Sequence, residues 1–301
     1  KASSTTAMGI STYGTTEVSG GEFVIRPKAT TGIGVRIYGG KTTISGNAHF
    51  DVQATETAYG VRISEETPHE YGGPLYNGTL EMNGGKLDVK TTTGTKAYGV
   101  FVGAESRNVT TTHASNTSYF AGNYANAGTA TINDGEINAT AKTTDAYAVF
   151  VEAALSGTFT GNKTPKLTIN GGKFMAKNSN GSANGAINNT AAAAANFKLT
   201  GGYYNIAPAG SYVIAGKSVK DVVRAKEQAI YDAGYVKKIA GNEYTVTWMS
   251  FNGATTLATT QVESGQVPVW TGERPDYHDA TSEREWIGWA TDTWNGGTDR
   301  K

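Results

Sequence analysis

Two short motifs alternate six times along the first two thirds of this chain, and the distance between them is nearly constant in one direction. The first motif is an apolar residue followed by small polar residues and glycine, as in Ile169-Asn170-Gly171-Gly172. The second follows the pattern of Ala58-Tyr59-Gly60-Val61. From the first motif to the second, the distance is 14 residues in four repeats and 15 in a fifth. The return distance varies from 11 to 35 residues. A period of this size in β-prone sequence predicts stacked repeats, each contributing one turn of a coil.

Each repeat therefore has two arms: a constant one from the first motif to the second, and a variable one from the second motif to the next copy of the first. All the variation in length falls in the variable arm. Equivalent positions of stacked repeats lie above one another, so the long insertions are expected to emerge on one side. Insertions gathered on one face often form a binding face. The alternative is that this corner merely tolerates extra length, as surface loops do.

Composition excludes several classes of protein. The chain has 301 residues, with 26 basic and 26 acidic side chains, which argues against a nucleic-acid partner or electrostatic attachment to a membrane. It contains no cysteine, so thiol catalysis and disulfides are excluded. No apolar stretch approaches the ~20 residues of a membrane span, so no membrane insertion is expected. Because the sequence begins with Lys1 inside a repeat, we expect it to be a piece of a longer protein.

Strand alternation predicts which side chains face the interior. In the second motif, we expect Tyr59, Val61 and Ile63 to point inward, together with their equivalents in the other repeats. In the arm after the first motif, inward pairs such as Phe50 with Val52 are expected. The inward residues expected in the other repeats are Ile33, Val35, Ile37, Tyr98, Val100, Val102, Tyr147, Val149, Val151, Phe23, Ile25, Leu87, Val89, Phe174, Ala176, Tyr204 and Ile206.

The outward positions of the second motif form a column of two arginines followed by two phenylalanines. These are Arg36, Arg62, Phe101 and Phe150. Loops at about 103–128 and 152–165 could fold back over the phenylalanines, or the rings could remain exposed as a platform for sugars or a partner protein. The insertions add further aromatic candidates for binding, namely Tyr71, Tyr119, Phe120 and Tyr124.

Carboxylates that neighbouring repeats would bring together are the candidates for a catalytic or metal site. Asp51 and Asp88 occupy equivalent positions and are followed by Asn138. Such a pair could bind Ca²⁺ weakly or serve as acid and base in glycosidic cleavage. The column contains no lysine or arginine, and His49 and His278 form no metal-binding pattern, so we predict no catalytic residue, no cofactor and no metal site.

The pattern changes after Ile206, where a helix over residues 218–233 is predicted. Ser218 is a good N-cap, Gly234 suits a helix end, and an apolar stripe includes Val219, Val222 and Ile230. A helix here would cover the open end of the stacked repeats. We therefore expect three regions: a β-solenoid at 1–210, a helical cap and linker at 211–242, and a small module at 243–301.

The last region resembles the Listeria–Bacteroides repeat, a β-grasp-like module of bacterial surface proteins that also occurs in internalin B-repeats. The resemblance rests on the strand Tyr244-Thr245-Val246-Thr247-Trp248, the Val262-to-Gly265 step and the closing Gly288-Trp289-Ala290-Thr291-Asp292. The usual Gly-Tyr-x-Phe before Gly-Trp is missing between Thr271 and Glu285. The preceding repeats look like pectin-lyase-like β-helices of gut bacterial surface proteins.

Together these features predict an all-β protein: a parallel, right-handed β-helix of about six rungs, one capping helix and a small β module. The resemblances imply an extracellular or bacterial cell-surface location, and a non-enzymatic adhesin or stalk segment. Its partner would be a host or dietary glycan, or a surface protein. Two alternatives remain open: a polysaccharide lyase or glycoside hydrolase using Asp51 and Asp88, and a purely structural spacer.

Overall fold

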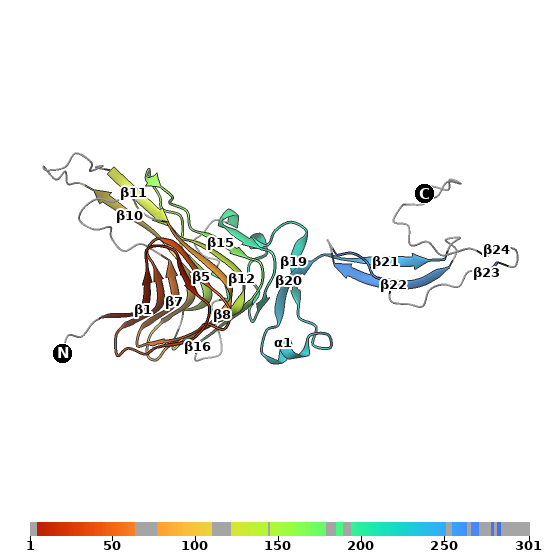
Figure 1. Cartoon of the computed structure of the whole chain (residues 1–301), viewed down its shortest axis with the longest axis horizontal. Coiled ribbons are helices and arrows are strands. Elements are labelled where there is room, and N and C mark those ends of the chain that lie inside the picture. Colours follow the sequence, from red (N-terminus) through yellow and green to blue (C-terminus); the bar gives the residue numbers. More distant parts are fainter. Residues whose placement is uncertain are drawn as a thin grey trace. The chain divides into compact units, whose positions relative to one another are not determined.

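The chain folds into two compact units, Lys1–Glu243 and Tyr244–Lys301. The computed structural model (Figure 1) describes residues 5–63, 77–109, 122–143, 145–178, 185–188, 194–250, 255–263, 266–270, 278–279 and 282–283. The first unit is all-β, with long parallel sheets built from the repeats. Within the described ranges, no helix reaches the length and hydropathy that crossing a bilayer requires.

Copies of the second motif form a five-stranded parallel sheet in the order β1-β4-β7-β9-β13. Its strands are β1 (Thr6–Thr12), β4 (Thr31–Ile37), β7 (Thr57–Ile63), β9 (Lys96–Val102) and β13 (Asp145–Val151). Ala58 pairs with Gly32 on one side and Ala97 on the other, which is the predicted alignment of the motif. The sixth copy contributes a single parallel bridge, between Val149 and Ile187.

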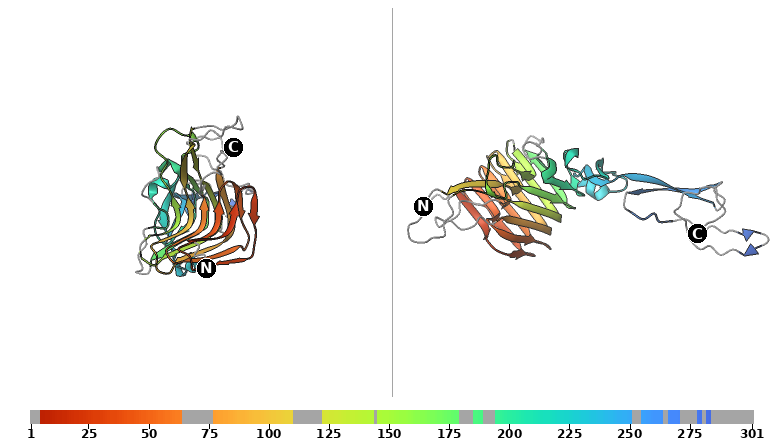
Figure 2. Two further views of the ribbon diagram at one scale, coloured as in Figure 1. Left: turned by 90° about the vertical axis from the view of Figure 1, so that its left-hand side faces the viewer. Right: turned by 90° about the horizontal axis from the view of Figure 1, so that it is seen from above.

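Copies of the first motif and the residues that follow each copy form most of a twelve-stranded sheet opposite the first (Figure 2), and two strands from after the last repeat complete it. Ile44, Met82 and Ile132 pair in parallel across it, as the motif alignment predicts. The register shifts between Ile132 and Glu136, at the small residues of the motif. The strands are β2 (Thr16–Val18), β3 (Glu22–Ile25), β5 (Gly40–Ile44), β6 (His49–Ala54), β8 (Gly78–Thr91), β12 (Thr129–Ala141), β15 (Lys166–Ile169), β16 (Lys173–Asn178), β17 (Phe197–Leu199), β18 (Tyr203–Tyr204), β19 (Lys217–Asp221) and β20 (Lys237–Gly241).

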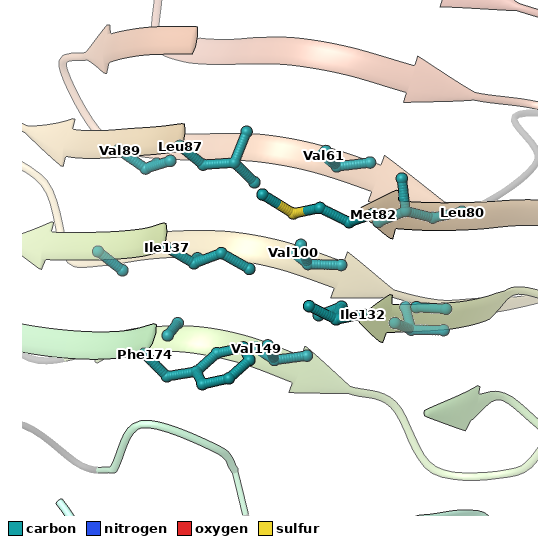
Figure 3. Close-up of a cluster of buried hydrophobic side chains, with 14 of the residues drawn as sticks. Val61, Leu80, Met82, Leu87, Val89, Val100, Ile132, Ile137, Val149 and Phe174 are labelled. Carbon is teal, nitrogen blue, oxygen red and sulfur yellow. The ribbon is translucent and has the colours of Figure 1, made fainter. Parts of the chain in front are cut away.

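The hydrophobic core lies between these two sheets (Figure 3). Leu87, Ile137 and Phe174 from the larger sheet pack with Val61, Val100 and Val149 from the smaller one. Aromatic rings stack along the larger sheet: Phe23 on Phe50 at 4.5 Å between centroids, and Phe174 on Tyr204 at 5.0 Å. The inward pairs predicted for this arm at Phe50, Leu87, Phe174 and their neighbours Val52, Val89 and Ala176 are confirmed as buried.

The prediction that the tyrosines of the second motif point inward is wrong. Tyr98 and Tyr147 pack with Phe101 outside the core, and Tyr59 packs against them. The register steps from Tyr59↔Tyr98 to Val61↔Val100, and a Cβ added to Gly60 would face Val89 in the core. Two consecutive residues, Gly60 and Val61, therefore face inward, and the alternation of faces is interrupted at the same place in the neighbouring strand, at Gly99 and Val100. Ile33, which pairs with Tyr59, is shifted in the same way.

The helix predicted at 218–233 is mostly absent. Residues Lys217–Asp221 form strand β19, and only Gln228–Asp232 form a helix, α1. β19 pairs antiparallel with β20, and β20 pairs antiparallel with β18 at the end of the large sheet. Val219 is β-branched and favours a strand once this partner is available. β19 ends the order of the sheet, and its Lys217 and Lys220 discourage pairing with another chain.

Two asparagine side chains occupy the place of a further strand beside the last repeats. Val151 donates its N–H to Asn188 Oδ1 at 2.7 Å, and Asn188 Nδ2 donates to Val151 O at 2.8 Å. Asn205 makes the same pair of bonds with Ala176, at 3.0 and 2.7 Å. Each amide therefore satisfies one backbone N–H and one C=O that a neighbouring strand would otherwise satisfy. Two 3₁₀ turns, Ala194–Asn196 and Gly210–Tyr212, lie near this end of the repeats.

The second unit contains a two-stranded sheet of β21 (Glu243–Met249) and β22 (Thr256–Glu263), and a two-residue pair of β23 (His278–Asp279) and β24 (Ser282–Glu283). Trp248 Nε1 donates to Thr260 Oγ1 at 2.8 Å, and the ring meets Trp270 edge-on at 5.4 Å. The closing Gly288-Trp289-Ala290-Thr291-Asp292 of the family resemblance lies outside the described residues.

Candidate functional site

The insertions build a small sheet of their own, which we call the insertion sheet. It consists of β10 (Ala104–Val109), β11 (Gly122–Ala127) and β14 (Thr160–Gly161). β10 and β11 pair antiparallel along their whole length, and Figure 1 shows this hairpin extending away from the repeats. β14, from the next insertion, pairs in parallel with β11 through Tyr124 and Ala125. Two separate insertions therefore meet in one structure, as their shared place in the repeat predicts.

The outer face of the five-stranded sheet carries an aromatic cluster of Tyr59, Tyr98, Phe101, Tyr147 and Phe150. Tyr98 lies 5.0 Å from Phe150 between ring centroids, and Phe101 stacks parallel to Phe150 at 5.5 Å. The predicted column Arg36, Arg62, Phe101 and Phe150 is in register, as expected. However, Phe101 is only 7% exposed and Phe150 is half-buried, so neither ring is an open platform.

Charged groups connect the aromatic cluster to the base of the insertion sheet. The Arg62 guanidinium lies over the Tyr59 ring at 5.2 Å and is 3.6 Å from Glu105 of β10. Glu152, just after β13, accepts a hydrogen bond at 2.9 Å from the N–H of Ala104, where β10 begins. Burial raises the pKa of Glu152, and the Ala104 N–H and Arg62 oppose that rise only in part. Burial also raises the pKa of Tyr98, so its phenol stays neutral.

The other candidates for binding fall in two groups. Tyr124 is half-buried on β11. Tyr71, Tyr119 and Phe120 lie outside the described residues.

Asp51 and Asp88 are adjacent on the outer face of the larger sheet, but each is bound to a cation. Their register, and that of Asn138 beyond them, is as predicted. Asp51 forms an ion pair with Arg26. Asp88 contacts Lys86 Nζ at 3.1 Å, His49 Nε2 at 2.9 Å and Asn138 Nδ2 at 2.9 Å. The column itself contains no lysine or arginine, but the inference that the pair lacks a basic neighbour is wrong, because Arg26, Lys86 and His49 contact it from nearby positions. His49 and Lys86 pair with each other two residues before Asp51 and Asp88, so they belong to a neighbouring column of the same face. An alignment of the aspartate column alone does not include them.

The ionisation of this network opposes acid–base chemistry at neutral pH. Burial alone raises the pKa of Asp88, but hydrogen bonds from Asn138, Lys86 and His49 outweigh it and lower that pKa overall. Burial tends to lower the pKa of Lys86, yet Asp88 and Glu136 raise it overall. Asp88 is thus ionised and Lys86 protonated near pH 7, so neither is poised as general acid or general base. Among the described residues, no three His, Cys, Asp or Glu side chains are arranged to hold a metal ion.

Replacing Asp88 with asparagine is expected to lower the free energy of unfolding by roughly 1 kcal/mol at pH 7 and by less at pH 2.5. Because the pKa of Asp88 is lower in the folded protein, its contribution is present above the unfolded pKa of about 3.9 and is lost as pH falls through the folded pKa. Urea denaturation at both pH values measures this difference. Asp221→Asn, at an exposed ion pair with Lys237, is the control. A loss that is equal at both pH values would contradict the assignment.

A row of side chains also crosses the large sheet where the register of β8 and β12 shifts. Asn133 Nδ2 donates to Asn83 Oδ1 at 2.7 Å, and Asn170 Nδ2 donates to Asn133 Oδ1 at 2.8 Å. Thr200 Oγ1 donates to Asn170 Oδ1 at 2.9 Å. We call Asn83, Asn133, Asn170 and Thr200 the amide ladder. Sequence reasoning missed it, although the signal was present: these residues occupy the same position in successive copies of the first motif.

Comparisons with known proteins leave the geometry as the only guide to function. The chain matches no protein-family model, and searches of curated proteins and of solved structures give no match.

Proposed function

We propose that the first unit is a right-handed parallel β-helix of about six rungs, and that it serves as a non-enzymatic adhesin or stalk segment of a secreted or cell-surface bacterial protein. Support for the fold comes from the parallel register of equivalent motifs and from the core shared by the two sheets. In the second unit, we propose a Listeria–Bacteroides repeat-like module that spaces or attaches the first. The strand containing Trp248 is the described part that supports this.

The insertion sheet is the observation that carries the functional proposal. Repeats that served only as a spacer would need no hairpin, yet β10 and β11 pair through six residues each. The base of that hairpin is fixed to the repeats by Glu152 and by the Arg62–Glu105 pair. A rigid base under a projecting hairpin is a suitable arrangement for presenting a recognition surface.

The partner that we propose is a host or dietary glycan, or a protein on a surface. Because Phe101 is buried, we place the proposed contact on the insertion sheet and not on the aromatic cluster. Tyr124 is the described candidate there, and Tyr71, Tyr119 and Phe120 remain candidates from the sequence that lie outside the described residues. Tyrosine suits this role because its ring gives contact area and its hydroxyl forms hydrogen bonds.

Shortening the hairpin tests this proposal. Ala104 and Ala127 pair directly, so replacing residues 105–126 with an Asn-Gly turn keeps the chain joined at that pair, and circular dichroism checks that the variant is folded. We expect this variant to lose at least about tenfold in affinity for any ligand found by glycan, mucin and surface-protein arrays. Lys90→Ala with Lys177→Ala, on the outer face of the large sheet, is the control and should bind normally.

Each remaining outcome contradicts the proposal in a different way. Undiminished binding by the shortened variant would place the ligand elsewhere on the molecule. No binding to any array at high protein concentration would favour the spacer alternative. Cleavage of a bound polysaccharide would favour the lyase or hydrolase alternative, and Asp88→Asn would then show whether Asp88 takes part.

A further inference from the structure

The amide ladder contains two of the most chemically labile sequences in proteins, and both are at the surface. Asn83 precedes Gly84 and Asn170 precedes Gly171, and both asparagines are exposed. In an Asn-Gly pair, the glycine backbone nitrogen loses its proton and attacks the asparagine Cγ. A new N–C bond closes a succinimide ring, the Cγ–Nδ2 bond breaks, and ammonia leaves. Water then opens the ring to give aspartate or isoaspartate. Glycine favours this reaction because it has no Cβ to hinder the approach.

We propose that the amide ladder protects these two Asn-Gly pairs from deamidation. Asn83 is held at both ends of its amide: Oδ1 accepts from Asn133, and Nδ2 donates to Glu81 Oε1 at 3.1 Å. Asn170 is also held at both ends, by Asn133 and by Thr200. To reach the glycine nitrogen, either side chain must rotate about its χ angles and give up both hydrogen bonds.

The backbone on each side of the ladder restricts the reaction further. Asn170 donates its own N–H to Ile132 O at 2.8 Å, and Thr200 donates its N–H to Ile169 O at 2.8 Å. Added Cβ atoms show how closely the turns stack: one on Gly171 would lie 2.5 Å from Asn133 O, and one on Gly84 would lie 3.1 Å from Gly46 O. The turns therefore have little room for the backbone rotation that the ring closure needs.

The side chain of Asn133 is hydrogen-bonded to both labile asparagines, so one substitution at Asn133 should affect both sites. Its side chain supplies the donor to Asn83 and the acceptor for Asn170. Asn133 is itself followed by Asp134, so it is not one of the labile pairs. Asn133→Ala should therefore speed deamidation at two sites that it does not itself occupy. Thr200→Val should speed it at Asn170 alone, because Thr200 bonds only that asparagine within the ladder.

The experiment is incubation of the folded protein at mildly basic pH, with peptide mass spectrometry counting aspartate and isoaspartate at each position. In the wild type, we expect both sites to react at least about tenfold more slowly than in the same chain unfolded in urea, since two hydrogen bonds of ordinary strength correspond to a factor of that order or more. Asn133→Ala should raise both rates severalfold. Thr131→Val, the same chemical change as Thr200→Val but at a position outside the ladder on the strand of Asn133, should change neither rate.

Circular dichroism identifies which variants remain folded. If Asn133→Ala does not fold, Thr200→Val still decides the question through the contrast between Asn170 and Asn83. Equal rates in folded and unfolded wild-type protein would overturn the proposal. So would a folded Asn133→Ala or Thr200→Val variant whose rates match those of the wild type.

Discussion

Replacing Gly60 with valine is expected to prevent the first unit from folding. A Cβ at this position would lie 2.5 Å from Gly99 O and 2.9 Å from Val89 Cγ2, and valine adds two methyl groups beyond it. The first neighbour is backbone of the adjacent strand, which cannot move without breaking the parallel pairing of β7 with β9. We expect a cost above about 4 kcal/mol, which is comparable to the whole stability of many domains. Far-UV circular dichroism and the soluble yield measure the result.

Gly14→Val is the matched control for this prediction. Gly14 is exposed, and a Cβ there would meet nothing within 4 Å. This variant should fold with the denaturation midpoint of the wild type to within experimental error. A soluble Gly60→Val protein with native circular dichroism would show that neighbouring repeats are not packed as closely as described.

Replacing Phe174 with alanine is expected to lower the free energy of unfolding by about 3–5 kcal/mol. Phe174 is fully buried and stacks on Tyr204 at 5.0 Å between ring centroids. The substitution removes apolar surface from the core and leaves a cavity, because the strands on either side are held by their pairing and cannot close the space. Urea denaturation followed by circular dichroism gives the change directly.

Lys177→Ala, three residues along the same strand, is the control. It shows whether any substitution in β16 lowers stability or only one that removes a core side chain. Lys177 is exposed, so this change should alter stability by no more than about 0.5 kcal/mol. If Phe174→Ala were no more destabilising than Lys177→Ala, the assignment of Phe174 to the core between the sheets would be wrong.

Much of the fold could be predicted because the spacing of the motifs sets the register. A constant 14-residue arm leaves one way to align successive repeats, and the observed pairs, such as Phe50 with Leu87, follow it. The positions of Tyr59, Tyr98 and Tyr147 could not be derived by alternation, which assumes one residue per step. At Gly60 and Gly99 two consecutive residues face the core, and the absence of a side chain makes that arrangement possible.

The remaining errors arise where partners are distant in sequence. The caps and apolar stripe at 218–233 favour a helix locally, but β20 provides a strand partner that a local pattern does not reveal. Asp88 appeared to lack a basic neighbour because only one column was considered, whereas Lys86 lies two residues before it on the same face. The spacing of the motifs placed the insertions on one side of the repeats. It could not predict that they form a sheet, because the inserted segments do not recur and so offer no register to align.

The two asparagines beside the last repeats, Asn188 and Asn205, have a consequence for how such a protein can change in length. Each amide bonds both the N–H and the C=O of one strand residue, Val151 for Asn188 and Ala176 for Asn205. A new strand laid beside either residue would first have to displace that amide. Lengthening the stack there therefore breaks two hydrogen bonds before any new strand pair forms, although the larger sheet itself continues past Asn205 through β18, β20 and β19.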